Sequence, residues 1–450
     1  RNLAGRLDAQ GRTIPLIAET GGLNSMIVDS SALTEQVVVD VVASAFDSAG
    51  QRCSALRVLC VQEDVADRVI NMLKGAMAEY SLGNPERLST DIGPVIDSEA
   101  KDNIDQHIEK MREKGRKVFQ SARAVGDDIK RGTFVLPTLI ELDSFDEMQR
   151  EIFGPVLHVV RYQRADLGKL LQQINDSGYG LTLGVHTRID ETIAQVVNTA
   201  KVGNLYVNRN MVGAVVGVQP FGGEGLSGTG PKAGGPLYMY RLLATRPQDA
   251  VAKQLQQENG EIQRPAEQAK VIQALQDWAT KHEPSLTALS AQYVELAQSG
   301  TVQMLNGPTG ERNSYSLLPR EHVLCLADER SDLLVQLAAA LAVGCQVLWQ
   351  EGELTRELFA ALPKAVQQRI TVLSQWRESD STFDAILHHG DSDQLREVCQ
   401  LAAQRPGAII GVHGLHKGET DIPLERLLIE HALSINTAAA GGNASLMTIG

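Results

Sequence analysis

Residues 29–61 read DSSALTEQVVVDVVASAFDSAGQRCSALRVLCV, and this stretch decides the fold class because a helical pattern passes directly into a strand pattern. Asp29-Ser30-Ser31 can cap a helix. The apolar residues that follow recur at helical spacing: Leu33, Val37, Val38, Val41, Val42, Ala45 and Phe46. The helix is expected to end before Asp47, and the apolar run 56–61 predicts a strand. A second helix is expected over 64–79, so the alternation favours an α/β layered domain.

The segments on either side predict turns and loops that display functional groups. Residues 14–18 are expected to form a strand that runs into the turn Glu19-Thr20-Gly21-Gly22. Residues 203–236 are rich in glycine, valine, asparagine and proline, which predicts irregular loop and extended chain. Binding groups are often displayed on chain of this kind.

The second half of the chain predicts a further α/β unit. Residues 248–294 form a polar connector, expected to be helical, and a domain boundary is expected there. Strands are expected at 323–327, 346–349, 371–373, 385–387 and 408–412, and helices at 333–343, 392–402 and 424–433. This order is typical of a doubly wound sheet.

Composition excludes several classes of protein. The 450 residues carry a formal net charge of −13 and are 43% hydrophobic and 22% charged, as in an ordinary globular protein. The acidic balance argues against nucleic-acid binding, but it leaves a small anionic substrate open. Five scattered cysteines, an odd number, indicate a reduced, cytoplasmic protein. The longest apolar stretch, residues 333–349, is too short for a bilayer span. The first residue is Arg, so we expect a processed chain or a piece of a longer one.

Three motifs could carry chemistry, and each has a plainer interpretation. Cys53 follows a glycine turn, and the neighbouring Arg52 could lower the pKa of its thiol, but a lone cysteine is more often a small buried hydrophobe. Glu19 could act as a general base on water if burial raises its pKa, or it could simply cap a turn. Glu151 and Phe153 stand before Gly154-Pro155, where an ordinary loop would also fit.

Taken together, these motifs resemble the signature of NAD-dependent aldehyde dehydrogenases. Glu19 and Cys53 are separated by 34 residues, and Cys53 and Glu151 by 98, as in that family. A fourth motif, Pro220-Phe221-Gly222-Gly223, follows in the same order. Residues 203–217, GNLYVNRNMVGAVVG, are similar to the 1-pyrroline-5-carboxylate (glutamate semialdehyde) dehydrogenases. The ending AGGNASLMTIG at 440–450 is similar to the long form of the bacterial bifunctional proline utilization enzymes.

The resemblance implies a mechanism and a set of site residues. Cys53 would attack the aldehyde of L-glutamate γ-semialdehyde, and its backbone N–H would stabilise the oxyanion by about 3–4 kcal/mol. NAD would take up the hydride, and Glu19 would activate the water that hydrolyses the thioester to L-glutamate. Glu151 would bind the nicotinamide ribose and Phe153 would hold the nicotinamide. The resemblance further implies four substrate-binding residues: Ser54, Gly213, Ala214 and Phe221.

The resemblance also implies a division of the chain. We expect a remnant of the NAD-binding domain (1–18), a catalytic domain (19–210), a substrate-anchor and glycine-rich loop region (211–247), the helical connector (248–294), a non-catalytic aldehyde dehydrogenase-like domain (295–434) and a terminal flap (435–450). The upstream proline dehydrogenase, with its FAD, and most of the NAD-binding domain would precede this chain in one polypeptide. A homodimer is compatible with the family, as is peripheral association of the longer protein with the inner membrane.

Other motifs are rejected, and two alternative functions stay open. Residues 223–228 match G-x-G-x-x-G, but Pro231 follows and no helix can start cleanly. The histidines at 388, 389, 413 and 416 lack partners at metal spacing, so no metal site is expected. The turn 327–331, ADERS, has no glycine and two carboxylates, so the second unit is expected to bind no NAD. The alternatives are another NAD-dependent aldehyde dehydrogenase and a cofactor-free thiol hydrolase, which would need a histidine base beside Cys53.

Overall fold

The computed structural model describes residues 3–125, 127–243, 247, 249–257, 260–378 and 381–438. These residues form two compact units. Of the described residues, the Cys53 unit comprises 19–228, 305–313 and 432–438. The second unit comprises residues 1–18, 229–304 and 314–431. The six functional segments expected from the sequence stay predictions.

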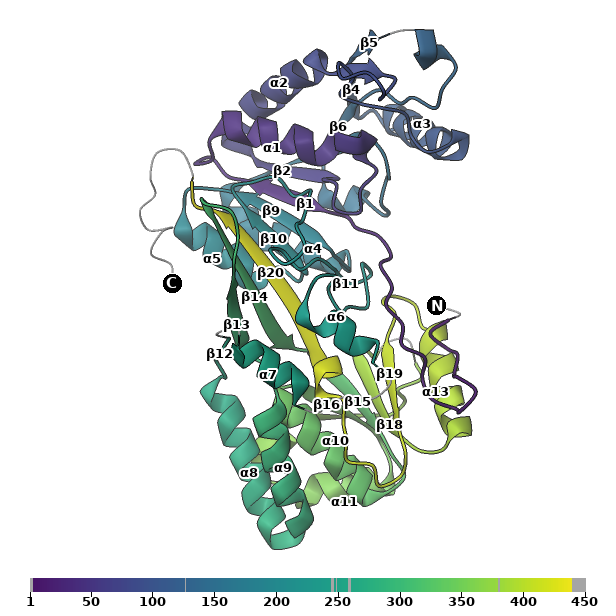
Figure 1. The fold of residues 1–450 in the computed structure, drawn as a ribbon, viewed down its shortest axis with the longest axis vertical. Coiled ribbons are helices and arrows are strands. Elements are labelled where there is room, and N and C mark those ends of the chain that lie inside the picture. Colours follow the sequence, from purple (N-terminus) through teal and green to yellow (C-terminus); the bar gives the residue numbers. More distant parts are fainter. Residues whose placement is uncertain are drawn as a thin grey trace. The chain divides into compact units, whose positions relative to one another are not determined.

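A parallel sheet forms the centre of the Cys53 unit (Figure 1). Its strands lie in the order β10 (Asn204–Val207), β9 (Thr182–His186), β1 (Ser25–Val28), β2 (Val58–Gln62), β7 (Val156–Tyr162) and β6 (Thr138–Leu142), with antiparallel β4 (Lys117–Gln120) after β6. Residues 432–435 of β20 (Leu428–Asn436) pair with β10. Every residue of β1, β2, β9 and β10 is buried, as expected for parallel strands covered on both faces.

Helices cover both faces of this sheet because the chain reverses its direction of travel across it. From β1 the chain moves through α1 (Thr34–Phe46) to β2, and from β7 it returns through α4 (Leu167–Asp176) to β9 and through α5 (Asp190–Thr199) to β10. Right-handed crossovers in opposite directions place these helices on opposite faces. The remaining elements of the unit are α2 (Glu63–Glu79), β3 (Ser81–Gly83), α3 (Ser98–Glu113), β5 (Arg123–Val125), β8 (Tyr179–Gly180) and β11 (Glu224–Gly225).

The second unit contains a five-stranded parallel sheet, which confirms the doubly wound prediction. The strand order is β17 (Ile370–Leu373), β16 (Gln346–Gln350), β15 (His322–Leu326), β18 (Ala385–His389) and β19 (Gly411–Leu415). Its helices include α10 (Arg330–Val343), α11 (Glu353–Ala361), α12 (Lys364–Gln367) and α13 (Ser392–Gln404). Helix α10 ends at Gly344, whose φ of 105° closes the helix in the left-handed conformation.

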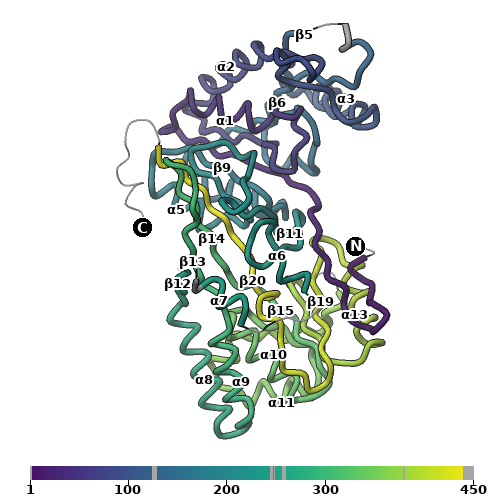
Figure 2. Tube along the Cα trace, viewed as in Figure 1, coloured from purple at the N-terminus to yellow at the C-terminus, as the bar shows by residue number. Residues whose placement is uncertain are grey.

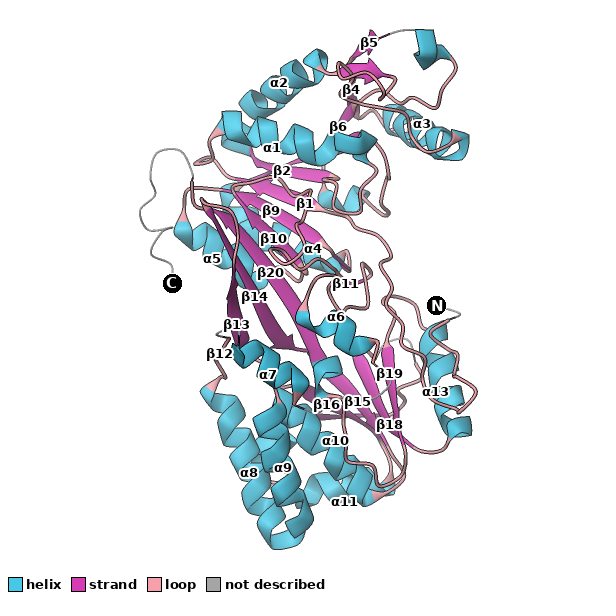
Figure 3. Ribbon diagram, in the orientation of Figure 1, coloured by secondary structure: helices cyan, strands magenta, loops and turns pink. Residues whose placement is uncertain are grey.

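The rest of the second unit supplies helices beside that sheet. Helices α8 (Ala266–His282) and α9 (Pro284–Leu296) lie side by side (Figure 3). The segment around Gly5 runs along α13 (Figure 2), where a Cβ on Gly5 would stand 3.4 Å from that of Ala403. The other elements are α6 (Pro236–Arg241), α7 (Ala250–Gln257), β12 (Glu261–Ile262), β13 (Thr301–Leu305) and β14 (Glu311–Pro319), the last of which, like β20, contributes residues to both units.

Several sequence predictions of local structure are wrong. Residues 14–18 form no strand, since only Thr13 and Glu19 make isolated bridges and Pro15 has no N–H to donate. The helix expected at 424–433 is a short 3₁₀ turn followed by β20, in which residues 428–434 alternate between buried and half-buried with period two. The strand expected at 408–412 lies at 411–415, after a turn with a positive φ at Gly407. Residues 203–236, by contrast, are expected to be irregular loop and extended chain, and they begin with the extended strand β10.

Two expectations concern the chain ends and membranes. Residues 439–450, most of the expected flap, lie outside the described residues. Among the helices that the structure describes, none combines the length and the apolar character needed to cross a bilayer.

Candidate active site

The turn that carries Cys53 has a left-handed backbone. Ser48, Ala49 and Gly50 have φ values of 56°, 54° and 67°. This conformation costs a residue with a side chain about 1–2 kcal/mol, and such strain often occurs at functional sites. At Gly50 only glycine fits, because a Cβ would stand 2.2 Å from the carbonyl oxygen of Gly154. The Cys53 turn is therefore in tight contact with the turn that contains Glu151 and Phe153.

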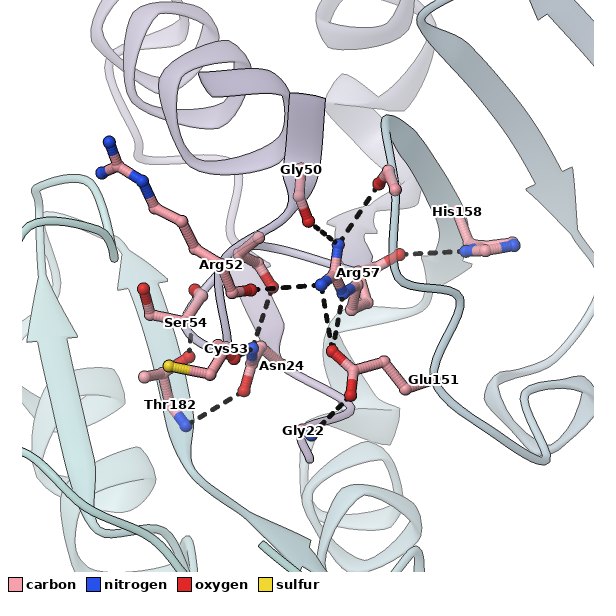
Figure 4. A network of polar contacts seen from close by, with 12 residues as sticks. Gly22, Asn24, Gly50, Arg52, Cys53, Ser54, Arg57, Glu151, His158 and Thr182 are labelled. Atoms are coloured by element: carbon pink, nitrogen blue, oxygen red, sulfur yellow. Dashed lines mark hydrogen bonds and ion pairs between the residues drawn. The ribbon is translucent and has the colours of Figure 1, made fainter. Parts of the chain in front are cut away.

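Asn24 holds the backbone around Cys53 (Figure 4). Its Nδ2 donates to the carbonyl oxygens of Cys53 at 2.6 Å and Ala55 at 2.9 Å. Its Oδ1 accepts from the backbone N–H of Thr182 at 3.2 Å. Asn24 is fully buried, whereas Cys53 is exposed. The backbone of Cys53 is thus fixed from the protein interior while its side chain stays accessible.

The pKa of Cys53 is raised, not lowered. Partial removal of water from around the thiol raises the pKa most, and the negative charge of Glu19 raises it further. The N–H groups of Ser54 and Cys53 lower it in part. The expectation that Arg52 lowers this pKa is wrong, because the Nε of Arg52 donates to the Ser48 hydroxyl at 3.0 Å and its guanidinium points away from the sulfur (Figure 4).

Glu151 lies in a buried ion pair. The Nε and Nη2 of Arg57 donate to its Oε1 at 3.1 and 3.0 Å, and its Oε2 accepts from the backbone N–H of Gly22 at 3.0 Å. Phe153 lies beside it, with its ring centroid 5.0 Å from the Arg57 guanidinium carbon and 46% of the residue exposed. Oε1 accepts both bonds from Arg57, whereas Oε2 accepts one and keeps a lone pair for a further donor.

Glu19 lies at the rim of the site. It bridges to Gly228, and the next residue, Thr20, donates its N–H to the carbonyl of Ser227 at 3.1 Å. Its residue is exposed, so its carboxylate is accessible to water. Its negative charge raises the pKa of the Cys53 thiol.

The expected substrate residues are connected to the Cys53 turn through two polar side chains. Ser54 is buried. The hydroxyl of Ser44 accepts from the N–H of Met211 at 3.0 Å, and its carbonyl accepts from the N–H of Leu56 at 2.9 Å. The loop before Gly213 and Ala214 therefore shares an anchor with the Cys53 turn. Gly213 is exposed and Ala214 is half-buried.

Asn204 anchors the turn that contains Phe221. It donates to the carbonyl of Pro220 at 2.8 Å and accepts from the N–H of Gly222 at 3.2 Å. Asn204 also pairs with Thr182, the residue that donates to Asn24. A chain of contacts therefore connects Cys53 with the flanks of Phe221.

The residues around Cys53 lie at the amino ends of the parallel strands. Asn24 precedes β1, Cys53 precedes β2, and Glu151 precedes β7. Ligands of open α/β sheets usually bind at the opposite, carboxyl edge. At the amino edge the strands lie beside helix carboxyl ends, whose partial charge is negative and does not favour a thiolate.

Sequence reasoning missed Asn24, Arg57 and a pair of histidines, His107 and His158, that contacts Arg57. His158 is fully buried and its Nδ1 lies 3.1 Å from the Arg57 carbonyl, while its Nε2 lies 2.8 Å from that of His107. Arg57 had a visible signal, since it is the one charged residue in the apolar run 55–61. Asn24 had none beyond its place at the start of an apolar strand. Among the described residues no cluster of three metal ligands occurs.

In the second unit, the turn after β15, residues 327–331, contains no glycine. The Oδ2 of Asp328 accepts from Gln394 at 3.1 Å, and Lys417 pairs with Glu329 at 3.8 Å. The expectation that this unit binds no NAD stays a prediction.

Comparison with known proteins gives matches across the chain. A family model described as "Aldehyde dehydrogenase family" matches residues 3–246. The chain is 65% identical to "Bifunctional protein PutA" of Escherichia coli strain K12, a match that covers 100% of this chain and 34% of that protein. It is 40% identical to "1-pyrroline-5-carboxylate dehydrogenase" of Anoxybacillus flavithermus over 50% of this chain and 43% of that protein.

A solved structure supports the fold. The structure of proline utilization A from Corynebacterium freiburgense matches with a TM-score of 0.65 at 23% identity, and covers 93% of this chain and 39% of that one. The chain spans about a third of the length of the curated relatives that it matches from end to end.

Proposed function

This chain belongs to the aldehyde dehydrogenase family, and from that premise we propose that it oxidises L-glutamate γ-semialdehyde to L-glutamate with NAD⁺ through a thioester on Cys53. We propose further that this is the second step of proline breakdown, performed as one part of a bifunctional protein. The 65% identity to a protein named as bifunctional and the 40% identity to a 1-pyrroline-5-carboxylate dehydrogenase support this assignment.

The observation that carries the proposal is the joint placement of Cys53, Glu19 and Glu151. Cys53 supplies an exposed sulfur on a turn whose backbone is fixed by Asn24. Attack requires the thiolate, so the exposed thiol first gives its proton to solvent water, and the N–H groups beside it favour the anion. The same N–H of Cys53 is suited to stabilise the oxyanion that forms on the substrate.

Glu19 acts after the thioester has formed. Its exposed carboxylate, at the rim of the site, takes a proton from water as that water attacks the thioester carbon. The bond between carbon and the Cys53 sulfur then breaks, and L-glutamate leaves. The negative charge of Glu19 also raises the pKa of Cys53, and this disfavours the thiolate that is needed for the attack. The later hydrolysis, in contrast, needs the negative charge of Glu19, because only the carboxylate can accept the proton of the water.

The residues at the other turn fit the nicotinamide end of NAD. Glu151 is held by Arg57 and Gly22 and keeps acceptor capacity for ribose hydroxyls, and Phe153 presents a half-exposed ring. When bound, NAD accepts the hydride that leaves the substrate carbon. The Gly50–Gly154 contact keeps this turn against the Cys53 turn.

The substrate carboxylate would be held away from the sulfur. We assign its anchors to Ser54 and to the backbone N–H groups of Gly213 and Ala214, with Phe221 against the aliphatic stem. The exposed, left-handed Gly213 leaves its backbone accessible, since a Cβ there would meet nothing within 4 Å.

The test measures NADH formation by the complete protein that contains this chain, with glutamate semialdehyde and with longer and shorter aldehydes that lack the carboxylate. We expect the semialdehyde to be preferred, and Cys53→Ala to abolish NADH formation. Equal activity on uncharged aldehydes would favour a general aldehyde dehydrogenase. Hydrolysis of a thioester substrate that needs Cys53 and proceeds as fast without any nicotinamide cofactor would favour the thiol hydrolase.

A further inference from the structure

Arg57 is the most completely enclosed charge beside the site. Its side chain has 0% exposure, so its guanidinium has no bulk water to solvate it. A buried cation is tolerated only when its donors are paired and its charge is offset. The pairing partners of Arg57 therefore reveal which parts of the protein depend on it.

The guanidinium bonds to both turns of the site at once (Figure 4). On the Cys53 turn, Nη1 donates to the carbonyl of Gly50 at 2.7 Å and Nη2 to that of Arg52 at 3.1 Å. On the facing turn, Nη1 donates to the carbonyl of Gly154 at 3.3 Å, and Nε and Nη2 donate to Glu151. The two carbonyls on the first turn belong to the residues one and three positions before Cys53.

The same side chain also supports the aromatic ring of the facing turn. The guanidinium carbon lies 5.0 Å from the centroid of Phe153, within the range of a cation–π contact. The backbone of Arg57 is fixed from behind, where its carbonyl accepts from the N–H of His158 at 2.9 Å. The planar group is thus held in one orientation between the two turns.

We propose that Arg57 is a positioning residue, which holds the Cys53 sulfur at a fixed position relative to the Glu151–Phe153 turn. This inference rests on the proposed function, in which that turn holds the nicotinamide. Only a planar, multidentate cation can donate to four acceptors in a plane, and a lysine ammonium supplies a single point charge. Arg57 thereby determines the distance between the nucleophile and the hydride acceptor.

The test compares Arg57→Lys with the wild-type complete protein, and uses Arg161→Lys as the matched control. Arg161 is also multidentate, to Glu63, Asp67 and Glu141, but it is part of a half-exposed ion cluster. Turnover is expressed per reactive Cys53 thiol, titrated by alkylation. We expect Arg57→Lys to lose about a hundredfold in kcat, the usual cost of misplacing reacting groups by about 1 Å, and Arg161→Lys to lose less than about twofold.

Hydrogen–deuterium exchange measures how firmly the two turns are held, and it does not depend on catalytic activity. In Arg57→Lys we expect faster exchange in both turns, residues 50–56 and 151–154, with α1 unchanged. If Arg57→Lys does not fold, Glu151→Gln replaces it, because loss of the carboxylate should release the guanidinium and loosen the 50–56 turn, which Glu151 contacts through Arg57.

The outcomes separate this inference from the proposed function. A variant with a lower melting temperature but unchanged turnover per thiol would show that Arg57 serves folding alone. Faster exchange in one turn only would also overturn the inference. A wild-type protein that forms no NADH from any aldehyde would refute the proposed function, while the exchange comparison would still decide whether Arg57 connects the turns.

Discussion

Asn24 and Cys53 are joined by a short hydrogen bond, in which the Asn24 amide donates to the Cys53 carbonyl oxygen at 2.6 Å. The same nitrogen donates to Ala55 at 2.9 Å, so one buried side chain fixes the backbone on both sides of Ser54. Cys53, the proposed nucleophile, is therefore positioned through its main chain, and its thiol does not have to contribute to its own placement.

Asn24→Asp should damage both stability and turnover. A carboxylate of the same shape accepts but does not donate, so two carbonyls would lose their donor, at about 1–3 kcal/mol for each buried group left unpaired. Denaturant unfolding and NADH formation measure the two effects. Asn175→Asp is the matched control, since Asn175 also donates to a carbonyl, that of Thr199 at 2.9 Å, at a more exposed place. Equal losses in both variants would contradict a special role for Asn24.

Alkylation by iodoacetamide should select Cys53 and speed up with pH. Cys53 is exposed, whereas the other four cysteines are buried, and burial raises the pKa of Cys60 to about 12 and of Cys399 to about 11. Because the pKa of Cys53 is also raised, its thiolate fraction should rise about tenfold per pH unit below that pKa. Mass spectrometry of the cofactor-free protein measures the rate. A rate that levels off below about pH 8 would show a lowered pKa instead.

Glu19→Gln should change two rates in opposite directions. Removal of the negative charge lowers the pKa of Cys53, so alkylation at neutral pH should become faster. Loss of the base should slow thioester hydrolysis by about 10²–10⁴-fold. Rapid mixing should then show a burst of NADH followed by slow turnover. Slower alkylation, or a loss of the burst itself, would place Glu19 in an earlier step.

Gly50→Ala should destabilise the protein, and Gly75→Ala should stabilise it. A methyl group at residue 50 would stand 2.2 Å from the Gly154 carbonyl oxygen, and an alanine there would have to adopt a φ of 67°. The clash and the left-handed backbone together should cost at least about 1–2 kcal/mol. Gly75 lies inside α2 with nothing within 4 Å of an added Cβ, and alanine there should contribute about 0.5–1 kcal/mol. Chemical denaturation of both variants provides the comparison. A tolerated Gly50→Ala would mean that the two turns can separate.

Acid should destabilise the protein through the His107–His158 pair. Burial lowers the pKa of His107 to about 4 and of His158 to about 3. The unfolded chain binds protons at these residues near pH 6.5, whereas the folded chain does not, so stability should fall as pH decreases from about 6.5 toward 4. Unfolding curves of His158→Gln across this range should show a weaker dependence on pH. An unchanged slope would assign the acid sensitivity to other groups.

The sequence predicted the fold class and the order of most elements because the relevant signals are local. The apolar spacing in 33–46 predicted α1, and the runs near 56–61 and 323–327 predicted β2 and β15 within two residues. The prediction failed at β20, where Leu424–Leu433 fits a helix equally well. Which period applies there depends on the partner strand β10, and a partner distant in sequence leaves no local signal.

The sequence by itself determined which chemical groups this protein carries: a thiol at 53, carboxylates at 19 and 151, an aromatic ring at 153 and glycines at the turns between them. Residue type and spacing are enough for that, since both are written in the chain. Only the tertiary structure decided that these groups lie at the amino edge of the sheet, that the pKa of Cys53 is raised, and that Arg57 bonds to both turns. These properties depend on burial and on contacts between residues far apart in the chain, such as Arg57 and Gly154, which are 97 positions apart, and no local pattern records either one.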